Sequence, residues 1–372
     1  MFFGLTAEQQ EYRHALRDFF ARTSTSQRIR QLMSDDRGHD HAAWERMAGD
    51  LGVQGLAIPE QYGGSGASFV ELAVALDEAG YALAGGPLFA SSVLASTCLQ
   101  ESGDAGAMAR YLPGIAAGQL IATLAMSGAD AAWDPDACPG VQARPGGDGY
   151  VLTGAASYVL EAQLADVILV VAQADDGPTL VAVDKGAAGL TQTALPLLDP
   201  TRRVSRLDFD RVSGRLVGVA GGAGPAVTRT LLAAAVALGA EQAGGMRRCL
   251  EMAVAYAKIR VQFGRPVGGF QAIKHLCADM YTLVETAHSA VLYASWCLAA
   301  DASDLDAVAH LTKAYCSDAY VEVAAGNIQV HGGIGFTWEH DCHLFFRRAA
   351  ASRQFLGSPS HHREMLARAI RL

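Results

Sequence analysis

Two kinds of segment are missing from this sequence, and each absence excludes a class of partner. No apolar run reaches the roughly 20 residues that cross a bilayer without a charge or a turn breaking it. No block of lysine and arginine is present that could neutralise a phosphate backbone, since the net charge of −9 comes from dispersed aspartate and glutamate. We therefore expect neither a membrane nor a nucleic acid as a partner.

The cysteines lack the spacing of a disulfide framework or a zinc finger. They are odd in number and scattered, without a Cys-x-x-Cys motif, and no charged-then-apolar leader precedes them. Their positions are Cys98, Cys138, Cys249, Cys277, Cys297, Cys316 and Cys342. We expect reduced thiols and a cytoplasmic location.

Residues 1–118 follow the period of amphipathic helices. Thr6 and Gln9 have the spacing of a capping box, and apolar residues at helical spacing follow, such as Leu16, Phe19 and Phe20. Two further helical patterns, HAAWERMAGDLGVQGL and SFVELAVALDEAGYALA, are separated by IPEQYGGSGAS, whose Pro and Gly suit a helix interior poorly. We predict an α-helical domain over residues 1–118.

The period changes to short strands over residues 119–222. Segments such as GYVLTGAASYVL, ADVILVVAQ and TLVAVD are rich in β-branched residues and are bounded by Gly, Asp and Pro. Over residues 223–372 the chain returns to long helices rich in Ala and Leu. These patterns predict an α+β multi-domain protein, in the order helices, strands, helices, and 372 residues give room for two or three packed units.

Two long motifs are more specific. RVQFGRPVGGFQAIKHLCADM and NIQVHGGIGFTWEHDCHLFFRRA resemble the acyl-CoA dehydrogenase family, and IPEQYGG and GDGYVLTGAASYVLEAQLADVILVVA resemble its N-terminal loop and central β hairpin. The resemblance covers essentially the whole chain. It implies an N-terminal α-helical domain, a central β barrel and a C-terminal four-helix bundle, assembled as a tetramer that holds FAD. It also implies an acyl-CoA substrate and an electron-transfer flavoprotein as partner.

Six residues of these motifs have the chemistry to hold FAD. They are Arg260, Phe263, Gln271, Gln329, Gly332 and Gly333. The guanidinium offers a planar fork of donors to a pyrophosphate, the amides donate hydrogens, and glycine lets a backbone approach closely. By resemblance they hold the adenosine end of an FAD that belongs largely to a neighbouring subunit. Without the resemblance, the arginine is a surface charge and GGIG is a helix C-cap and turn.

The usual general base is missing. Dehydrogenating an acyl thioester requires a carboxylate that takes the α-proton while the β-hydrogen leaves as hydride to the flavin. By ungapped counting, Leu356 occupies the position where the family usually supplies a glutamate, and Arg229 occupies the position used by other members. Glu241 lies twelve residues further on, about 18 Å along a helix and on another face. It is either an unusual base or an interhelical ion-pair partner. We predict no catalytic residue in this chain.

The strands that face the flavin in the family are also altered. Ser127 remains as a possible cofactor contact, but Gly128 stands where the family has glutamate. Ala156, Tyr158 and Leu160 replace Lys, Trp and Thr. The sequence therefore suggests half of an FAD site, in which the groups for the adenosine end remain but the flavin contacts and the general base are missing. The sequence resembles the small, non-catalytic chain of heteromeric acyl-CoA dehydrogenases, such as the small subunit of pimeloyl-CoA dehydrogenase and the paired enzymes of steroid side-chain degradation, in which unlike chains share FAD sites.

Two other functions stay open. One is a homomeric acyl-CoA dehydrogenase that uses another base such as Glu241, and the other is a structural subunit without flavin. His275 follows Gln271 by one helical turn and is more often a packing residue than a cofactor contact. His361 and His362 lack a third ligand, so we expect no metal site.

Overall fold

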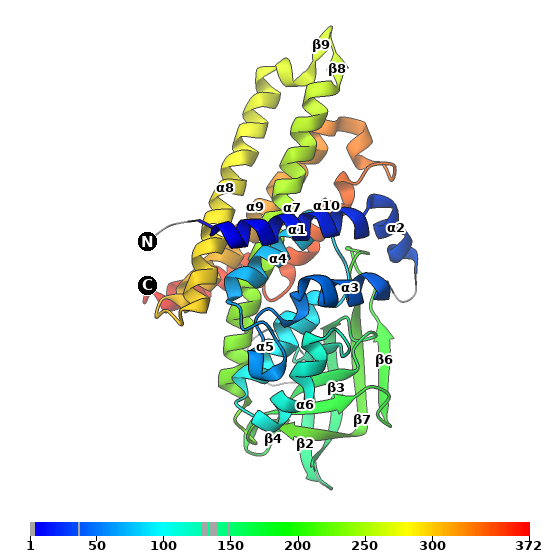
Figure 1. Ribbon diagram of the computed structural model, residues 1–372, viewed down its shortest axis with the longest axis vertical. Coiled ribbons are helices and arrows are strands. Elements are labelled where there is room, and N and C mark those ends of the chain that lie inside the picture. The colour runs from blue at the N-terminus through cyan, green and yellow to red at the C-terminus, as the bar shows by residue number, and fades with distance from the viewer. Residues whose placement is uncertain (1–3, 36–37, 128–132, 134–139, 148) are drawn as a thin grey trace. The chain divides into compact units, whose positions relative to one another are not determined.

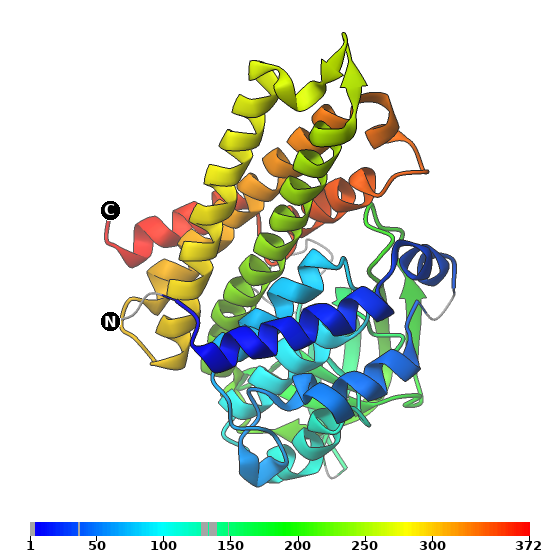
Figure 2. The same ribbon diagram turned by 45° about the horizontal axis from the view of Figure 1, so that its top comes forward.

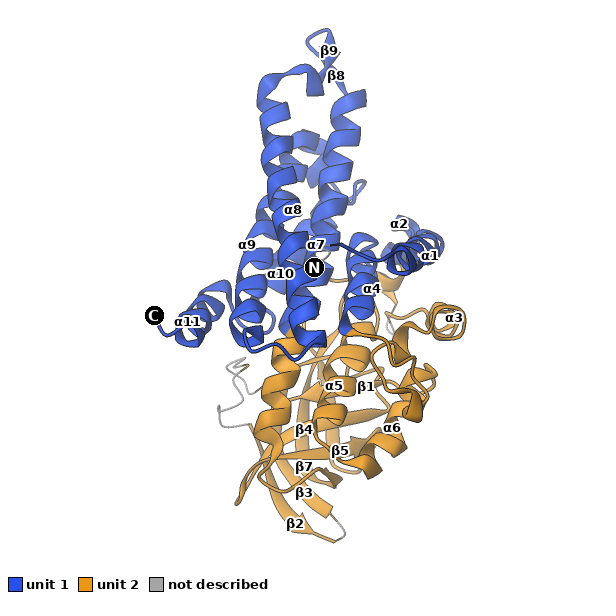
Figure 3. Ribbon diagram, turned by 60° about the vertical axis from the view of Figure 1, so that its left-hand side comes forward, with its two compact units in different colours: residues 1–30, 69–84, 235–372 blue, residues 31–68, 85–234 orange. Residues whose placement is uncertain are grey.

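The computed structural model of the chain describes residues 4–35, 38–127, 133, 140–147 and 149–372. It divides into two compact units (Figure 3). Unit 1 consists of residues 1–30, 69–84 and 235–372, and unit 2 consists of residues 31–68 and 85–234. The division passes through two helices, α2 (Ser26–Ser34) and α7 (Ala223–Ile259).

Unit 1 is built from helices (Figures 1 and 2). Besides its part of α7 it contains α1 (Ala7–Thr23), α4 (Phe69–Tyr81), α8 (Gln271–Ala299), α9 (Leu305–His331), α10 (Cys342–Gln354) and α11 (Pro359–Ala369). Helix α9 contacts α8, α10 and α11 and buries most of its length. A short hairpin of β8 (Val261–Gln262) and β9 (Arg265–Pro266) joins α7 to α8. The C-terminal four-helix bundle is confirmed.

The predicted start of the first helix is confirmed. The backbone N–H of Gln9 donates to Thr6 Oγ1 at 3.2 Å, and the N–H of Thr6 donates to Gln9 Oε1 at 2.9 Å. This reciprocal pair satisfies two of the N–H groups that a helix leaves free at its start. Leu16, Phe19 and Phe20 are buried, and α1 contacts α4.

Helices α4 and α7 touch through their backbones. A Cβ atom added to Gly244 would lie 1.8 Å from the carbonyl oxygen of Asp77, and one added to Gly80 would lie 1.9 Å from that of Glu241. Only glycine allows so close an approach. Among the described helices, α7 is long and apolar enough by length and composition to cross a membrane, but 67% of that stretch is buried inside the protein, as is typical of a core helix.

Unit 2 contains a closed β barrel beside short helices. The helices are α3 (His41–Leu51), a π-helix (Phe89–Ala95), α5 (Ser96–Glu101) and α6 (Ala105–Ala116). The strands are β1 (Ala122–Ala125), β2 (Val141–Gly146), β3 (Gly149–Leu160), β4 (Val167–Ala174), β5 (Gly177–Asp184), β6 (Leu190–Ala194) and β7 (Val204–Val217). Pairing runs β4-β2-β3-β7-β5 and returns to β4, while β1 pairs with β4 and β6 pairs with β7.

The barrel encloses an apolar core, and the predicted central barrel is confirmed. Inward residues such as Leu152, Val170, Val181 and Leu207 are fully buried. Sequence analysis missed β6, because its side chains are mostly exposed and LTQTA has no apolar alternation. The domain limits 1–118, 119–222 and 223–372 stay a prediction.

Candidate functional site

The first motif lies where α7 ends. Arg260 is exposed, and its carbonyl oxygen accepts a hydrogen bond of 2.8 Å from the N–H of Val267, which closes the β8–β9 hairpin. Phe263 in this hairpin is 91% exposed, and its ring meets the edge of the Phe270 ring at 6.1 Å between centroids. Gln271 begins α8 and is exposed. These side chains contribute little to the core of their own chain.

The second motif lies where α9 ends. Gln329 is exposed, and Gly332 has φ 64° and ψ −142°, a conformation that essentially only glycine adopts. A Cβ atom on Gly332 or Gly333 would meet no atom within 4 Å, so this backbone is open to a group from outside. The rings of Tyr256 and His331 stack at 4.3 Å between centroids. This contact brings the ends of α7 and α9, and with them both motifs, to one end of the helical unit.

Leu356 lies in the turn between α10 and α11. Its side chain is 3% exposed, and its φ of +61° is in the left-handed region that non-glycine residues rarely adopt. The Nε2 atom of His362 lies 2.8 Å from the carbonyl oxygen of Leu356. The ammonium of Lys313 donates to the carbonyl oxygens of Arg353 and Gly357. The turn is therefore fixed from two helices, and it presents a side chain that cannot accept a proton.

Burial determines the protonation of the groups behind this turn. It lowers the pKa of Lys313 to about 7, although Asp318 acts in the opposite direction. Burial and the charge of Lys313 lower the pKa of His362 to about 3, so this ring is neutral near pH 7. A neutral ring that donates from Nε2 accepts at Nδ1, and Nδ1 of His310 lies 2.8 Å away.

Comparison with known proteins assigns the chain. The acyl-CoA dehydrogenase N-terminal domain matches residues 6–119, and the C-terminal domain matches residues 222–371. Acyl-CoA dehydrogenase IpdE2 of Mycobacterium tuberculosis is 34% identical over 97% of this chain and 96% of its own length. The chain belongs to the acyl-CoA dehydrogenase family.

Solved structures agree with this assignment. A variant of the Tcur3481-Tcur3483 steroid ACAD is 32% identical and covers 98% of both chains, with a TM-score of 0.87. The ChsE4-ChsE5 complex from Mycobacterium tuberculosis is 27% identical over 100% of this chain and 99% of that chain, with a TM-score of 0.88. Acyl-CoA dehydrogenases bind FAD, so the predicted cofactor is confirmed.

The motif residues of this acyl-CoA dehydrogenase fit FAD from one side. An exposed guanidinium at Arg260 suits the pyrophosphate, and exposed amides at Gln271 and Gln329 suit the polar edge of an adenosine. A Cβ atom added to Gly333 would meet no atom within 4 Å, so its backbone leaves room for another group. The individual roles of these residues remain predictions.

Two of the three altered positions on β3 are buried. Ala156 and Leu160 are 2% and 3% exposed. Tyr158 has φ +58° within an irregularity of the β3–β7 register between residues 156 and 159, and it is partly exposed. Ser127 is buried, and its role in cofactor binding stays a prediction. Gly128 lies outside the described residues.

Glu241 and Arg229, the two other positions considered for the base, each form an ion pair. Glu241 is buried, and its Oε1 atom accepts a hydrogen bond of 2.8 Å from Nη1 of Arg348, which is itself buried. Arg229 is in unit 2, and its Nε atom lies 3.8 Å from Oε1 of Glu101. Of the two roles considered for Glu241, the geometry is that of the interhelical ion-pair partner.

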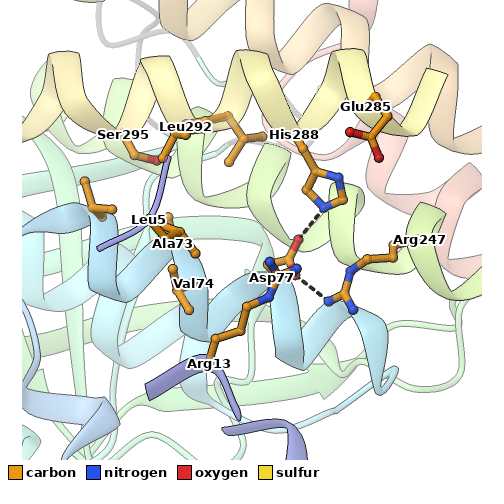
Figure 4. Close-up of a pocket in the computed structure, with 12 residues that line it drawn as sticks. Leu5, Arg13, Ala73, Val74, Asp77, Arg247, Glu285, His288, Leu292 and Ser295 are labelled. Atoms are coloured by element: carbon orange, nitrogen blue, oxygen red, sulfur yellow. Dashed lines mark hydrogen bonds and ion pairs between the residues drawn. The ribbon is translucent and has the colours of Figure 1, made fainter. Parts of the chain in front are cut away.

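Sequence analysis missed a buried cluster around Asp77. Its Oδ1 atom accepts hydrogen bonds from Arg247 at 2.6 Å and Arg13 at 3.2 Å, and Oδ2 lies 2.9 Å from Nε2 of His288 (Figure 4). Burial alone would raise the pKa of Asp77, but these neighbours outweigh it and hold the pKa well below its usual range. Glu78 accepts from Arg13 and Arg247 as well.

A cavity of about 290 Å³ lies beside this cluster. Its apolar lining residues are Leu5, Val70, Ala73, Val74, Val291 and Leu292. The sequence contained one signal for the cluster, the adjacent carboxylates of Asp77 and Glu78 in an apolar helix, because buried carboxylates require cationic partners. Those partners are far away in sequence and could not be named from it.

Proposed function

We propose that this acyl-CoA dehydrogenase chain is the non-catalytic subunit of a two-chain enzyme that dehydrogenates a steroid-derived acyl-CoA. The observation that carries the proposal is the contrast between exposed residues of the FAD motifs and a buried leucine at the base position, Leu356. A chain with half a site on its surface requires a second chain for the other half. We therefore expect FAD sites between unlike subunits.

The relatives support the class of partner and substrate. One similar structure is named the Tcur3481-Tcur3483 steroid ACAD, and another is a complex of ChsE4 with ChsE5. We infer a partner that is itself an acyl-CoA dehydrogenase, and a thioester whose acyl group carries a steroid or a remnant of one. Electrons would leave to an electron-transfer flavoprotein.

This chain would act by binding and orientation. Arg260 would neutralise the pyrophosphate of FAD, and Gln271 and Gln329 would donate amide hydrogens to its adenosine half. When bound, FAD supplies the acceptor for the β-hydrogen, which leaves the substrate as hydride with its electron pair. A carboxylate of the partner would take the α-proton, which leaves a double bond between the two carbons. Leu356 would contribute only an apolar wall.

The test is the visible spectrum of three preparations: this chain alone, the partner alone, and the two co-expressed. The candidate partner is the product of the neighbouring open reading frame. We expect this chain to be colourless alone and the pair to be yellow, with bleaching of the flavin by a steroid side-chain CoA thioester and not by butyryl-CoA. A yellow chain that is bleached without a partner would identify a homomeric enzyme. A colourless pair would identify a structural subunit.

A further inference from the structure

Two histidines and a cysteine meet where α9 leads into α10. His331, His340 and Cys342 each offer a ligand atom, and these atoms lie within 4.8 Å of one another. His331 and Cys342 are buried, and His340 is half-buried. Two imidazoles and one thiolate form a donor set that zinc prefers, because it is of intermediate softness and accepts both nitrogen and sulfur.

The hydrogen bonds of the cluster orient the rings. Nδ1 of His331 lies 2.8 Å from the carbonyl oxygen of Asn327, which can only accept, so Nδ1 carries the hydrogen and Nε2 keeps a lone pair. Zinc-binding histidines are typically held in this way by a backbone carbonyl. The N–H of Cys342 donates to Nδ1 of His340 at 3.3 Å, a long hydrogen bond that His340 would have to give up to bind the ion through this lone pair. The two imidazole rings lie 4.4 Å apart between centroids.

The side chain of Asn327 is a second and independent observation. It is 0% exposed, and its amide meets the thiols of Cys249 and Cys342, which are weak hydrogen-bonding partners. It lies one helical turn before His331, and it borders the thiol of Cys342, on whose pKa its amide acts. Since thiols are weak partners, this buried amide can accept and donate further hydrogen bonds, which favours a water molecule beside it.

The surroundings allow a cation. Two arginines lie near His340, Arg30 on α2 and Arg248 on α7, and Asp341 balances the charge of Arg30 at 2.6 Å. On binding Zn²⁺, the Cys342 thiol would release its proton to solvent, so the thiolate would cancel one of the two charges of the ion. No carboxylate is needed for the site.

We infer that His331, His340 and Cys342 bind one zinc ion, with a water molecule held by Asn327 in the fourth position. The ion would join the end of α9 to the start of α10 across the 3₁₀ turn Gly332–Phe336. That turn contains Gly332 and Gly333, so the ion would stiffen the backbone that faces FAD. The proposal adds a cofactor to the chain and does not depend on which subunit is catalytic.

The test uses the purified full chain, stripped with a chelator and titrated with Co²⁺ and then Zn²⁺. We expect one equivalent to bind, with the thiolate-to-cobalt absorption of a cysteine ligand, which zinc displaces. Cys342→Ser should abolish this absorption, and His340→Ala should weaken zinc binding by at least about 100-fold, since even loss of an outer partner weakens metal sites by 10–100-fold. Matched controls are Cys316→Ser, a buried thiol on α9, and His361→Ala. Both should bind as the unchanged chain does.

Three results would overturn the proposal. They are a titration without thiolate absorption, absorption that survives in Cys342→Ser, and weak binding that no ligand variant alters. Circular dichroism of each variant separates loss of the site from loss of the fold, and half-buried His340 gives a variant that leaves the core intact. The readout is a cobalt spectrum of this chain alone, so failure of the two-chain function would leave the result unaffected.

Discussion

Side chains are exposed at the end of unit 1 that carries the two FAD motifs, whereas the side chain of Leu356 in the turn after α10 is buried. At the motif end, Arg260, Phe263 and Gln329 project to the surface, where they add little to the fold of their own chain. At the turn, Leu356 is buried, and its backbone is held by His362 and neighbouring contacts. Under the proposed function, this difference separates two kinds of position. Those that can serve a cofactor from outside keep the required groups, whereas the predicted base position, Leu356, is buried.

The largest effect, on the rate of flavin reduction, should come from removing the general base of the partner and adding a carboxylate at position 356 of this chain. Replacing the partner's catalytic glutamate with glutamine should lower the activity of the pair by about 10²–10⁴-fold, the usual contribution of a positioned base. Leu356→Glu in this chain alone should stay inactive, because Ala156 and Leu160 leave the flavin-facing strand without its polar groups. Stopped-flow bleaching of flavin by an acyl-CoA measures both.

Leu356→Met is the matched control for that exchange. It keeps an apolar side chain of similar volume at the buried position, and the pair that contains it should retain its activity. Rapid bleaching by the Leu356→Glu chain without a partner would mean that only the base had been lost, and the comparison above would fail.

The second effect is on stability. Glu241→Gln should lower the free energy of unfolding by about 3–5 kcal/mol, because it removes the negative charge that pairs with the buried Arg348 guanidinium at 2.8 Å. Urea unfolding measures this, and the double variant with Arg348→Met should recover part of the loss. If Glu241 were the base, Glu241→Gln would instead remove flavin reduction and leave stability nearly unchanged.

A smaller effect, on FAD affinity, tests the exposed residue Arg260. Arg260→Ala should weaken FAD binding by the assembled pair by about tenfold or more, because a charge-assisted contact contributes about 1.5–3 kcal/mol. Lys258→Ala is the matched control, since this exposed cation lies two residues earlier on α7. Flavin release followed by fluorescence gives both affinities. Equal weakening in the two variants would indicate a general charge effect.

The smallest effect is a pH dependence at the buried turn. The pKa of Lys313 in the folded chain is about 7, below the ordinary value of about 10.4 in an unfolded chain. Between these values the unfolded state binds more protons, so this group makes the folded state more stable as pH rises from about 7 toward 10. Lys313→Met should show a flatter profile in urea unfolding. Parallel profiles for the two proteins would contradict the assignment.

Local patterns predicted most of the fold. The capping box at Thr6, the strand GYVLTGAASYVL and the long helices after residue 223 lie where period and turn residues placed them. The strand Leu190–Ala194 was not predicted, because its position follows from pairing with β7 and not from its own residues. Pairing between distant segments is invisible to a local period.

The site could be predicted only in part. The FAD motifs are contiguous strings, so the resemblance could nominate Arg260 and Gln329, whose roles stay predictions. The partner of Glu241 is Arg348, more than one hundred residues away, and the neighbours of Asp77 come from three other helices. Such buried charges reveal that a partner exists without naming it. Their identity depends on the crossing of helices, which the sequence does not state.

The strand pairs that close the barrel of unit 2 differ in length. Strands β3 and β7 pair from Tyr150 to Leu160, interrupted by two register shifts, but β2 and β4 pair only at Gln142 and Gln173. Local opening of a folded protein begins where the fewest backbone hydrogen bonds must break. We therefore expect the barrel to open locally between β2 and β4. Each opening would briefly expose two strand edges to other chains. Amide hydrogens beside Gln142 would then exchange with solvent long before those in the middle of β3.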